Sequence, residues 1–265
     1  MARIRTTSLL KRKQDGEKIT VLTAYDYPFA KIMDECGIEV ILVGDSCANN
    51  VMGLPDTLRI TMDDMVHHVA MVSRAVERAL VVADMPFLSY QVTPAEAVRN
   101  AGRFVAEAGA HAVKLEGPAD RFGDAIRGIL NTGIPVMGHI GFTPQSVHQI
   151  GGYKVQGRDA SSGQRLKEEA LGLQEIGCFA IVLELVQADV AAEITASLTV
   201  PTIGIGSGAG CDGQVLIAQD MLGFNEPKTF FKVFGDAKKT IQDACDRYIR
   251  EVKAGTFPGK EHEHR

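Results

Sequence analysis

The chain has 265 residues and a net charge of −5, and its 45% hydrophobic residues are typical of a globular protein. Acidic and basic residues are interspersed, so we expect no nucleic-acid partner, and no run approaches the roughly 18 apolar residues of a membrane span. The five cysteines are scattered without a CxxC pair, which favours reduced thiols in a cytoplasmic protein over disulfides or a zinc site.

Seven short apolar runs, rich in Val, Ile and Leu, alternate with amphipathic stretches along the chain. Continuous apolar character is typical of parallel strands that are buried on both faces. In chain order the runs begin near residues 19, 40, 80, 112, 135, 180 and 201. We expect an eighth, short strand at Gln214–Ala218.

Helices are predicted between these runs from their start and stop signals. Residues 60–78 begin with Thr61 ahead of two aspartates, and residues 94–108 begin with Thr93-Pro94. Further helices are expected at residues 162–176, 187–198 and 236–254. Seven or eight strand–helix units favour a closed (β/α)₈ TIM barrel, an α/β fold, over an open sheet, and no GxGxxG follows the first strand.

The chain shows no linker, so we expect one domain over residues 1–265, with an N-terminal extension of about residues 1–18 and a polar tail of about residues 256–265. Residues 141–161 lack periodicity and are rich in Gly and Gln. Long loops in compact domains are usually functional, and this one is either a lid over the active site or a subunit contact. The glycine-rich residues 203–213 either bind phosphate or form a tight turn.

Polar, titratable side chains gather at the C-terminal ends of the predicted strands. In a barrel these ends converge on one face, where active sites form. Converging carboxylates repel one another, and a divalent cation removes that repulsion. Oxygen ligands suit Mg²⁺, so the positions alone predict a hard-cation site at the barrel mouth. The residues concerned are Asp26, Asp45, Asp84, Glu116, Glu184, His139 and Ser207.

Several of these residues also have a purely structural interpretation. Asp26 is equally well explained as a helix cap, and His139 as a hydrogen-bonded core histidine. Lys114 and Glu116 alternate on one strand and face the same side, where they either serve the site or form a salt bridge to a neighbouring element. Glu184 lies inside the apolar run AIVLELV, where a carboxylate has no capping role, and this favours a function for it.

Nine segments in order resemble the ketopantoate hydroxymethyltransferase family. They span about Thr20 to Gly223 and read LTAYDYPFA, VGDS, TMDDM, ADMPF, VKLEG, HIGFTPQSV, GGYKVQGR, LELV and IGIGSGAGCDGQVL. The resemblance implies a TIM barrel of the phosphoenolpyruvate/pyruvate type. It implies transfer of a hydroxymethyl group from 5,10-methylenetetrahydrofolate to 3-methyl-2-oxobutanoate, which forms 2-dehydropantoate in pantothenate biosynthesis. It also implies a homo-oligomer, typically a decamer of two pentameric rings. Leu88 departs from the family pattern, because a glycine is common at this position.

The resemblance also implies roles for residues at the strand ends. Asp45, Asp84 and Glu116 would be the carboxylates of a Mg²⁺ site, the last of them through water. Asp45, Ser46, Asp84 and Lys114 would contact the 2-oxo acid.

Glu184 would be the general base that removes the C3 proton, and bound Mg²⁺ would stabilise the resulting enolate. We place His139 and the segment 141–161 on the folate side as a hypothesis.

Two rival functions remain open at this point. The first is a Mg²⁺-dependent carbon–carbon lyase of the same superfamily. A cysteine on a mobile loop that acts as the acid would favour this alternative, and Cys47 is the only candidate for that role. The second is a non-catalytic assembly protein, which the titratable strand ends disfavour.

Overall fold

The computed structural model describes residues 3–226 and 230–264. Residues 1 and 2 of the predicted extension and residue 265 of the predicted tail lie outside this part. The chain divides into two compact units, the first ending at Leu216 and the second beginning at Ile217. This division does not test the prediction of one domain over residues 1–265, which stays a prediction.

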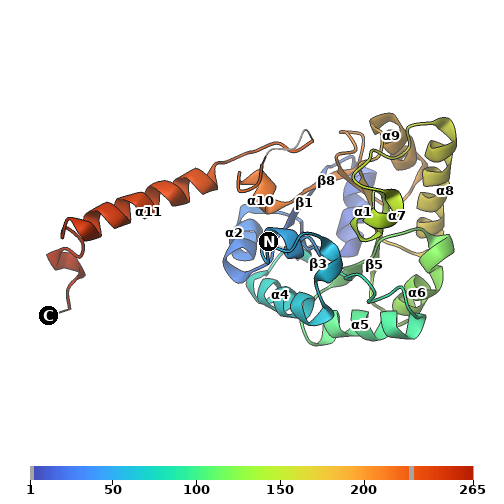
Figure 1. Ribbon diagram of the computed structural model, residues 1–265. Coiled ribbons are helices and arrows are strands. Elements are labelled where there is room, and N and C mark those ends of the chain that lie inside the picture. Colours follow the sequence, from blue (N-terminus) through green and yellow to red (C-terminus); the bar gives the residue numbers. More distant parts are fainter. Residues whose placement is uncertain (1–2, 227–229, 265) are drawn as a thin grey trace. The chain divides into compact units, whose positions relative to one another are not determined.

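The first unit is built on a barrel of parallel strands. In the described ranges, each strand pairs with the next in chain order, and β8 returns to pair with β1. The predicted (β/α)₈ barrel is therefore confirmed, and Figure 1 shows helices surrounding its strands. The strands are β1 (Ile19–Thr23), β2 (Val40–Val43), β3 (Leu80–Asp84), β4 (Ala112–Lys114), β5 (Val136–Gly141), β6 (Ala180–Glu184), β7 (Thr202–Ile205) and β8 (Gly213–Leu216).

Polar and apolar residues do not alternate along the strands, because both faces of the sheet are covered. Every residue of β2 and of β3 is buried, because the barrel interior covers one face and the helices cover the other. The eighth strand begins one residue earlier than predicted, and Ala218 already belongs to the next helix.

The helices of the first unit are α1 (Thr6–Asp15), α2 (Tyr27–Cys36), α3 (Cys47–Asn50), α4 (Met62–Ala75), α5 (Pro94–Ala106), α6 (Ala119–Asn131), α7 (Val147–Ile150), α8 (Ala160–Ile176) and α9 (Ala188–Ser197), with 3₁₀ turns η1 (Thr57–Arg59) and η2 (Pro144–Ser146). Four of these helices, α2, α4, α5 and α8, begin where a side chain accepts a hydrogen bond from a free backbone amide. Thr61 and Asp64 form the capping box that the sequence predicts for α4. Helix α8 begins two residues earlier than predicted, because Asp159 accepts a hydrogen bond from the amide of Ser162.

The second unit contains α10 (Ala218–Met221), α11 (Ala237–Lys253) and the turn η3 (Lys260–His262). No residue of the fully described α11 is buried. Its apolar side chains Ile241, Tyr248, Ile249 and Val252 are between 44 and 59% exposed. Helix α11 thus has an apolar face that its own unit leaves uncovered. Among the described residues, no helix combines the length and the apolar composition needed to cross a bilayer.

The backbone at Leu88 has a φ of 65°, in the left-handed region that favours glycine. This is the position at which the family resemblance leads us to expect a glycine. Leu88 is also largely exposed, so burial of its side chain does not offset the cost of this conformation.

Candidate active site

Three strand ends bring an ionic cluster to the barrel mouth. Asp84, the last residue of β3, lies opposite Lys114, the last residue of β4, in the strand register. The Nζ atom of Lys114 is 2.8 Å from Asp84 Oδ1 and 4.0 Å from Glu116 Oε1. Asp45 follows β2, and its backbone amide donates to Asp84 Oδ2 at 3.2 Å. All four charged side chains are buried.

Carboxylates outnumber the buried cations in this cluster. Burial raises the pKa of Asp45 to about 7, and the neighbouring charge of Asp84 adds to the effect while Lys114 opposes it. Burial also holds the pKa of Glu116 well above its ordinary value, with Lys114 again opposing the shift. Burial works against the charge of Lys114, but the three carboxylates raise its pKa, so the ammonium persists at neutral pH. The cluster therefore carries more acid than it can neutralise by itself.

His139 connects this cluster to Glu184. Its Nδ1 atom lies 3.2 Å from Lys114 Nζ, and its Nε2 atom lies 3.4 Å from Glu184 Oε2. Burial and the nearby charge of Lys114 hold the pKa of His139 well below its ordinary value, so the ring is neutral. An ammonium can only donate, so Nδ1 accepts and the ring proton resides on Nε2, which has no hydrogen-bond partner among the described residues.

Glu184 is placed at the rim of the barrel mouth. Its side chain is 15% exposed, whereas those of Lys114, Glu116 and His139 are 3 to 4% exposed. It ends β6, directly opposite Gly141 of β5 in the register. Of these four, Glu184 is the group most open to a bound substrate.

Gln145 is the main site residue that the sequence analysis misses. It lies in η2 within the predicted loop 141–161, and its side-chain Nε2 donates to Asp45 Oδ2 and to the carbonyl of Met85, each at 2.9 Å. Its backbone amide donates to Glu116 Oε2 at 3.0 Å. Tyr90 completes the arrangement, because its hydroxyl lies 2.9 Å from Gln145 Oε1 and from the carbonyl of Glu116. The one available signal was the position of Gln145 in the segment HIGFTPQSV.

Ser46 directly follows Asp45 of the cluster, and its contact with the 2-oxo acid stays a prediction. Its Oγ is 2.8 Å from the hydroxyl of Tyr25, which is buried and lies between β1 and α2. Burial raises the pKa of Tyr25, so its phenol remains protonated and available as a hydrogen-bond donor.

Three other strand-end candidates have structural roles. Asp26 caps α2 by accepting from the amide of Phe29 at 2.9 Å. The hydroxyl of Ser207 donates to the carbonyl of Leu183 at 2.8 Å and accepts from the amide of Val186 at 2.9 Å. It thereby fixes the backbone on both sides of Glu184. In the glycine-rich segment, a Cβ at Gly210 would come within 2.8 Å of Ala192 Cβ, so close packing accounts for that glycine.

Within the described ranges, no group of three or more His, Cys, Asp and Glu side chains is arranged to hold a metal ion. Mg²⁺ does not require such a cage, because proteins commonly bind it through one or two carboxylates and leave several waters in place. The donors at the mouth fit this mode. Three buried carboxylates, on Asp45, Asp84 and Glu116, face one buried ammonium, which leaves two negative charges for a divalent cation to balance.

Comparison with known proteins shows one family along nearly the whole chain. The profile of the ketopantoate hydroxymethyltransferase family matches residues 3–260. The chain is 57% identical over 255 residues to the 3-methyl-2-oxobutanoate hydroxymethyltransferase of Geobacter sulfurreducens, covering 95% of each chain. It is 53% identical over 264 residues to the enzyme of the same name from Syntrophomonas wolfei, covering 99% of this chain and 95% of the relative.

Solved structures of similar fold are more distant in sequence. Phosphonopyruvate hydrolase, solved as a complex with oxalate and Mg²⁺, aligns with a TM-score of 0.62 at 12% identity, covering 97% of this chain and 93% of the other. For 2,3-dimethylmalate lyase, a member of the PEP mutase/isocitrate lyase superfamily, the TM-score is 0.60 at 16% identity, with 97% and 91% covered. These likenesses support the fold, a (β/α)₈ barrel.

Proposed function

The chain belongs to the ketopantoate hydroxymethyltransferase family, and on that premise we propose that it transfers the one-carbon unit of 5,10-methylenetetrahydrofolate to 3-methyl-2-oxobutanoate, forming 2-dehydropantoate. It is an enzyme of the transferase class. The observation that carries the proposal is the continuous polar path at the barrel mouth. This path runs from the buried acids through Lys114 and His139 to Glu184.

The first step is loss of the C3 proton of the 2-oxo acid. We assign the proton to Glu184, which is the most exposed carboxylate of the path and therefore the one that a substrate can reach. His139 Nε2 lies 3.4 Å from Glu184 Oε2 without a hydrogen bond between them, so His139 stands beside the base as a neutral polar neighbour. The other ring nitrogen of His139 lies 3.2 Å from Lys114 Nζ, which connects this neighbour to the buried cluster.

The second requirement is a place for the negative charge of the enolate. Lys114 supplies a permanent positive charge, and Ser46 with Tyr25 supplies hydroxyl donors at the same mouth. Asp45 and Asp84, with Glu116 through water, would hold Mg²⁺, which when bound supplies the charge that polarises the 2-oxo group.

In the last step, the one-carbon unit moves from the folate to the substrate. The C3 carbanion forms a carbon–carbon bond to the methylene carbon of the folate. The two bonds from that carbon to the folate nitrogens break, and water supplies the hydroxyl oxygen, so tetrahydrofolate is released. The hypothesis that His139 faces the folate is now less suited to the geometry than its role beside Glu184, because its ring is buried between Lys114 and Glu184.

The rival functions have no observation in their favour. Cys47 is buried at the start of α3, so it does not match a cysteine on a mobile loop that acts as the acid. The non-catalytic alternative is excluded by membership of an enzyme family.

The base assignment is tested without folate. In D₂O with Mg²⁺, the wild-type enzyme is expected to exchange the C3 proton of 3-methyl-2-oxobutanoate, and Glu184→Gln is expected to slow this exchange by at least about 10²-fold. Binding of the acid, measured by calorimetry, is expected to change little. Glu193→Gln, an exposed change on α9, is the matched control. Exchange at the wild-type rate in Glu184→Gln would remove Glu184 from the role of base.

We also propose that the protein is a homo-oligomer, a decamer by analogy with the family, and that it is cytoplasmic. The uncovered apolar face of α11 supports self-association. Light scattering is expected to give ten times the chain mass of 28.6 kDa. A mass equal to one chain at micromolar concentration would contradict the assembly.

A further inference from the structure

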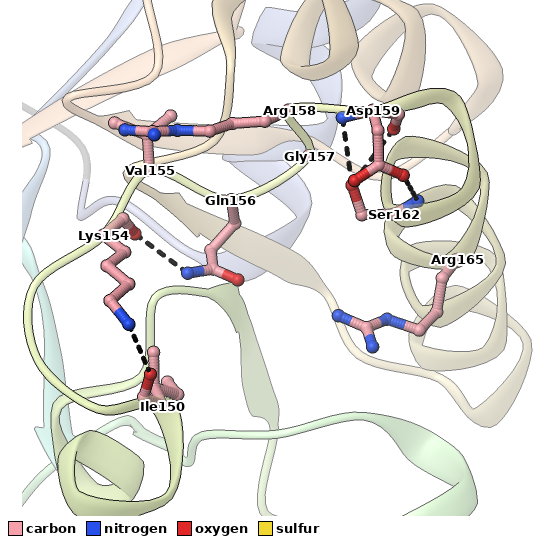
Figure 2. Close-up of a pocket in the computed structure, with 9 residues that line it drawn as sticks. All are labelled: Ile150, Lys154, Val155, Gln156, Gly157, Arg158, Asp159, Ser162 and Arg165. Atoms are coloured by element: carbon pink, nitrogen blue, oxygen red, sulfur yellow. Dashed lines mark hydrogen bonds between the residues drawn. The ribbon is translucent and has the colours of Figure 1, made fainter.

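A cavity of about 420 Å³ lies outside the ionic cluster, against the segment that follows α7. Figure 2 shows Lys154, Arg158 and Arg165 at separate positions around it, the first two from the loop and the third from α8. Gln156 and Gly157 also line the cavity. None of the residues that line it belongs to the proposed catalytic set.

The three basic side chains around this cavity have few carboxylate partners. Lys154 Nζ reaches only the carbonyl of Ile150, at 3.5 Å. Within the described parts of the chain, Arg158 has no hydrogen bond or ion pair. Arg165 has a loose partner, Glu169, at 3.4 Å. The only carboxylate in the lining, Asp159, is engaged by the amide of Ser162 at the start of α8.

This arrangement suits an extended anion with several charges. A single phosphate would require the cations to converge on one point, whereas these are spread around the cavity (Figure 2). Arginine pairs well with carboxylates, because its planar guanidinium can donate two parallel hydrogen bonds.

The cavity is connected to the barrel mouth by a short segment of backbone. The amide of Gln156 donates to the carbonyl of Leu185 at 2.7 Å, and the amide of Gln187 donates to the carbonyl of Gln156 at 3.0 Å. These bonds attach the loop directly after Glu184. Arg158 is five positions after Tyr153, so the segment spans at most roughly 18 Å.

Tyr153 marks the mouth end of this segment. Its ring packs on Phe142, with the ring centroids 4.5 Å apart. Partial burial raises the pKa of Tyr153, and the charges of Glu184, Asp45 and Glu116 add to the shift, which places the ring in the field of the catalytic cluster. The segment therefore runs from the site of reaction to the cationic cavity.

We propose that this cavity binds the glutamate tail of the folate co-substrate through Lys154, Arg158 and Arg165. The inference rests on the proposed function. The reactive carbon of methylenetetrahydrofolate lies at its pteridine end, which must meet the enolate, and its carboxylates lie at the opposite end. Between them, the aromatic middle of the folate passes Tyr153, which offers a ring for stacking. A polyglutamate tail carries additional carboxylates and gains most from three separated cations.

The test compares methylenetetrahydrofolate with one glutamate and with five. In the wild type, KM is expected to be at least about tenfold lower for the pentaglutamate. The double variant Lys154→Gln/Arg158→Gln, and separately Arg165→Gln, are expected to reduce that preference several-fold. Calorimetry with tetrahydrofolate mono- and pentaglutamate provides the same comparison without turnover. Arg127→Gln, on the exposed surface of α6, is the matched control and is expected to keep the wild-type preference.

Each outcome has a distinct meaning. A loss of preference confined to the cavity variants supports the proposal. Equal weakening of both folates would indicate an anion site unrelated to the tail and would overturn it, as would a preference unchanged in every variant. Proton exchange by the wild type reports on the proposed function separately, because it needs no folate. If exchange occurs while the tail has no effect, the cavity proposal fails alone. If neither exchange nor transfer occurs, the proposed function fails and the cavity proposal fails with it.

Discussion

The side-chain amide of Gln145 donates to Asp45 and to the carbonyl of Met85, while its backbone amide donates to Glu116. One uncharged residue therefore fixes two of the three buried carboxylates. Each of these hydrogen bonds stabilises an ionised acid, and removal of a buried partner typically costs about 1–3 kcal/mol.

We expect Gln145→Leu to lower the free energy of unfolding by about 1–3 kcal/mol and to weaken Mg²⁺ binding, since Asp45 loses its side-chain donor. Urea unfolding and calorimetry with Mg²⁺ measure the two effects. Gln164→Leu, which removes a comparable amide from the exposed face of α8, is expected to change neither. If Gln145→Leu matched that control in both measurements, the bridging role would be wrong.

The charged residues of this site could be predicted, and the uncharged ones could not. An acid that ends an apolar run, such as Asp84 or Glu184, is conspicuous because burial of a charge is costly unless it has a purpose. Gln145 and Tyr90 carry no such signal, because amides and phenols are ordinary in loops and their positions depend on the path of the chain between elements.

At the scale of secondary structure, the approach of β5 to β6 depends on Gly141. The φ of Gly141 is +96°, and a Cβ there would lie 2.3 Å from the carbonyl oxygen of Glu184 and 2.7 Å from Val186 Cγ2. A side chain at this position would therefore push against the backbone of the proposed base.

Gly141→Ala is expected to lower kcat more than it changes KM for the 2-oxo acid, because it displaces Glu184 and leaves Lys114 in place. A loss of stability of about 1–3 kcal/mol should accompany it. Gly133→Ala is a matched control, since Gly133 also has a positive φ, of +88°, but a Cβ there would meet nothing within 4 Å. Steady-state kinetics of the two variants distinguish the effect of a Cβ pressed against Glu184 from the effect of an alanine at a positive φ. Equal kcat values would show that the contact with Glu184 is unimportant.

Strand and helix positions followed from the sequence because each has a local cause. Apolar runs gave the strands to within a residue or two, and Thr61 and Thr93 marked the starts of α4 and α5. The start of α8 was missed because Asp159 lies in a stretch without periodicity. The course of residues 141–161 depends on tertiary hydrogen bonds such as that from Gln156 to Leu185, and no local pattern encodes these.

At the scale of the whole molecule, the buried acids couple stability to pH. The folded-state pKa of Asp45 lies near 7, above its ordinary 3.8, so the folded protein holds a proton that the unfolded chain releases. The stabilisation is complete below about pH 4 and is lost as the pH rises toward 7. In the metal-free protein, ionisation of Asp45 across that pH range is expected to lower the free energy of unfolding by on the order of a few kcal/mol.

The measurement is urea unfolding of wild type and Asp45→Asn in EDTA at several pH values. The stability of the wild type relative to the variant should fall between pH 4 and 7. Added Mg²⁺ should reverse much of the fall, because a bound cation stabilises the ionised carboxylate. A difference that stays constant with pH would indicate that Asp45 is ionised throughout.

The hydrogen bond between Asp45 and Gln145 joins residues that are 100 positions apart. At a synthesis rate of about 5–20 residues per second, Asp45 leaves the ribosome roughly 5–20 s before the residue that will hold it. Glu184, which completes the polar path, follows later still. Until Lys114 has been made, the carboxylates of Asp45 and Asp84 also lack the cation that offsets their burial. The barrel mouth is therefore assembled late in the life of the nascent chain, and an N-terminal fragment ending before Gln145 has no means of forming it.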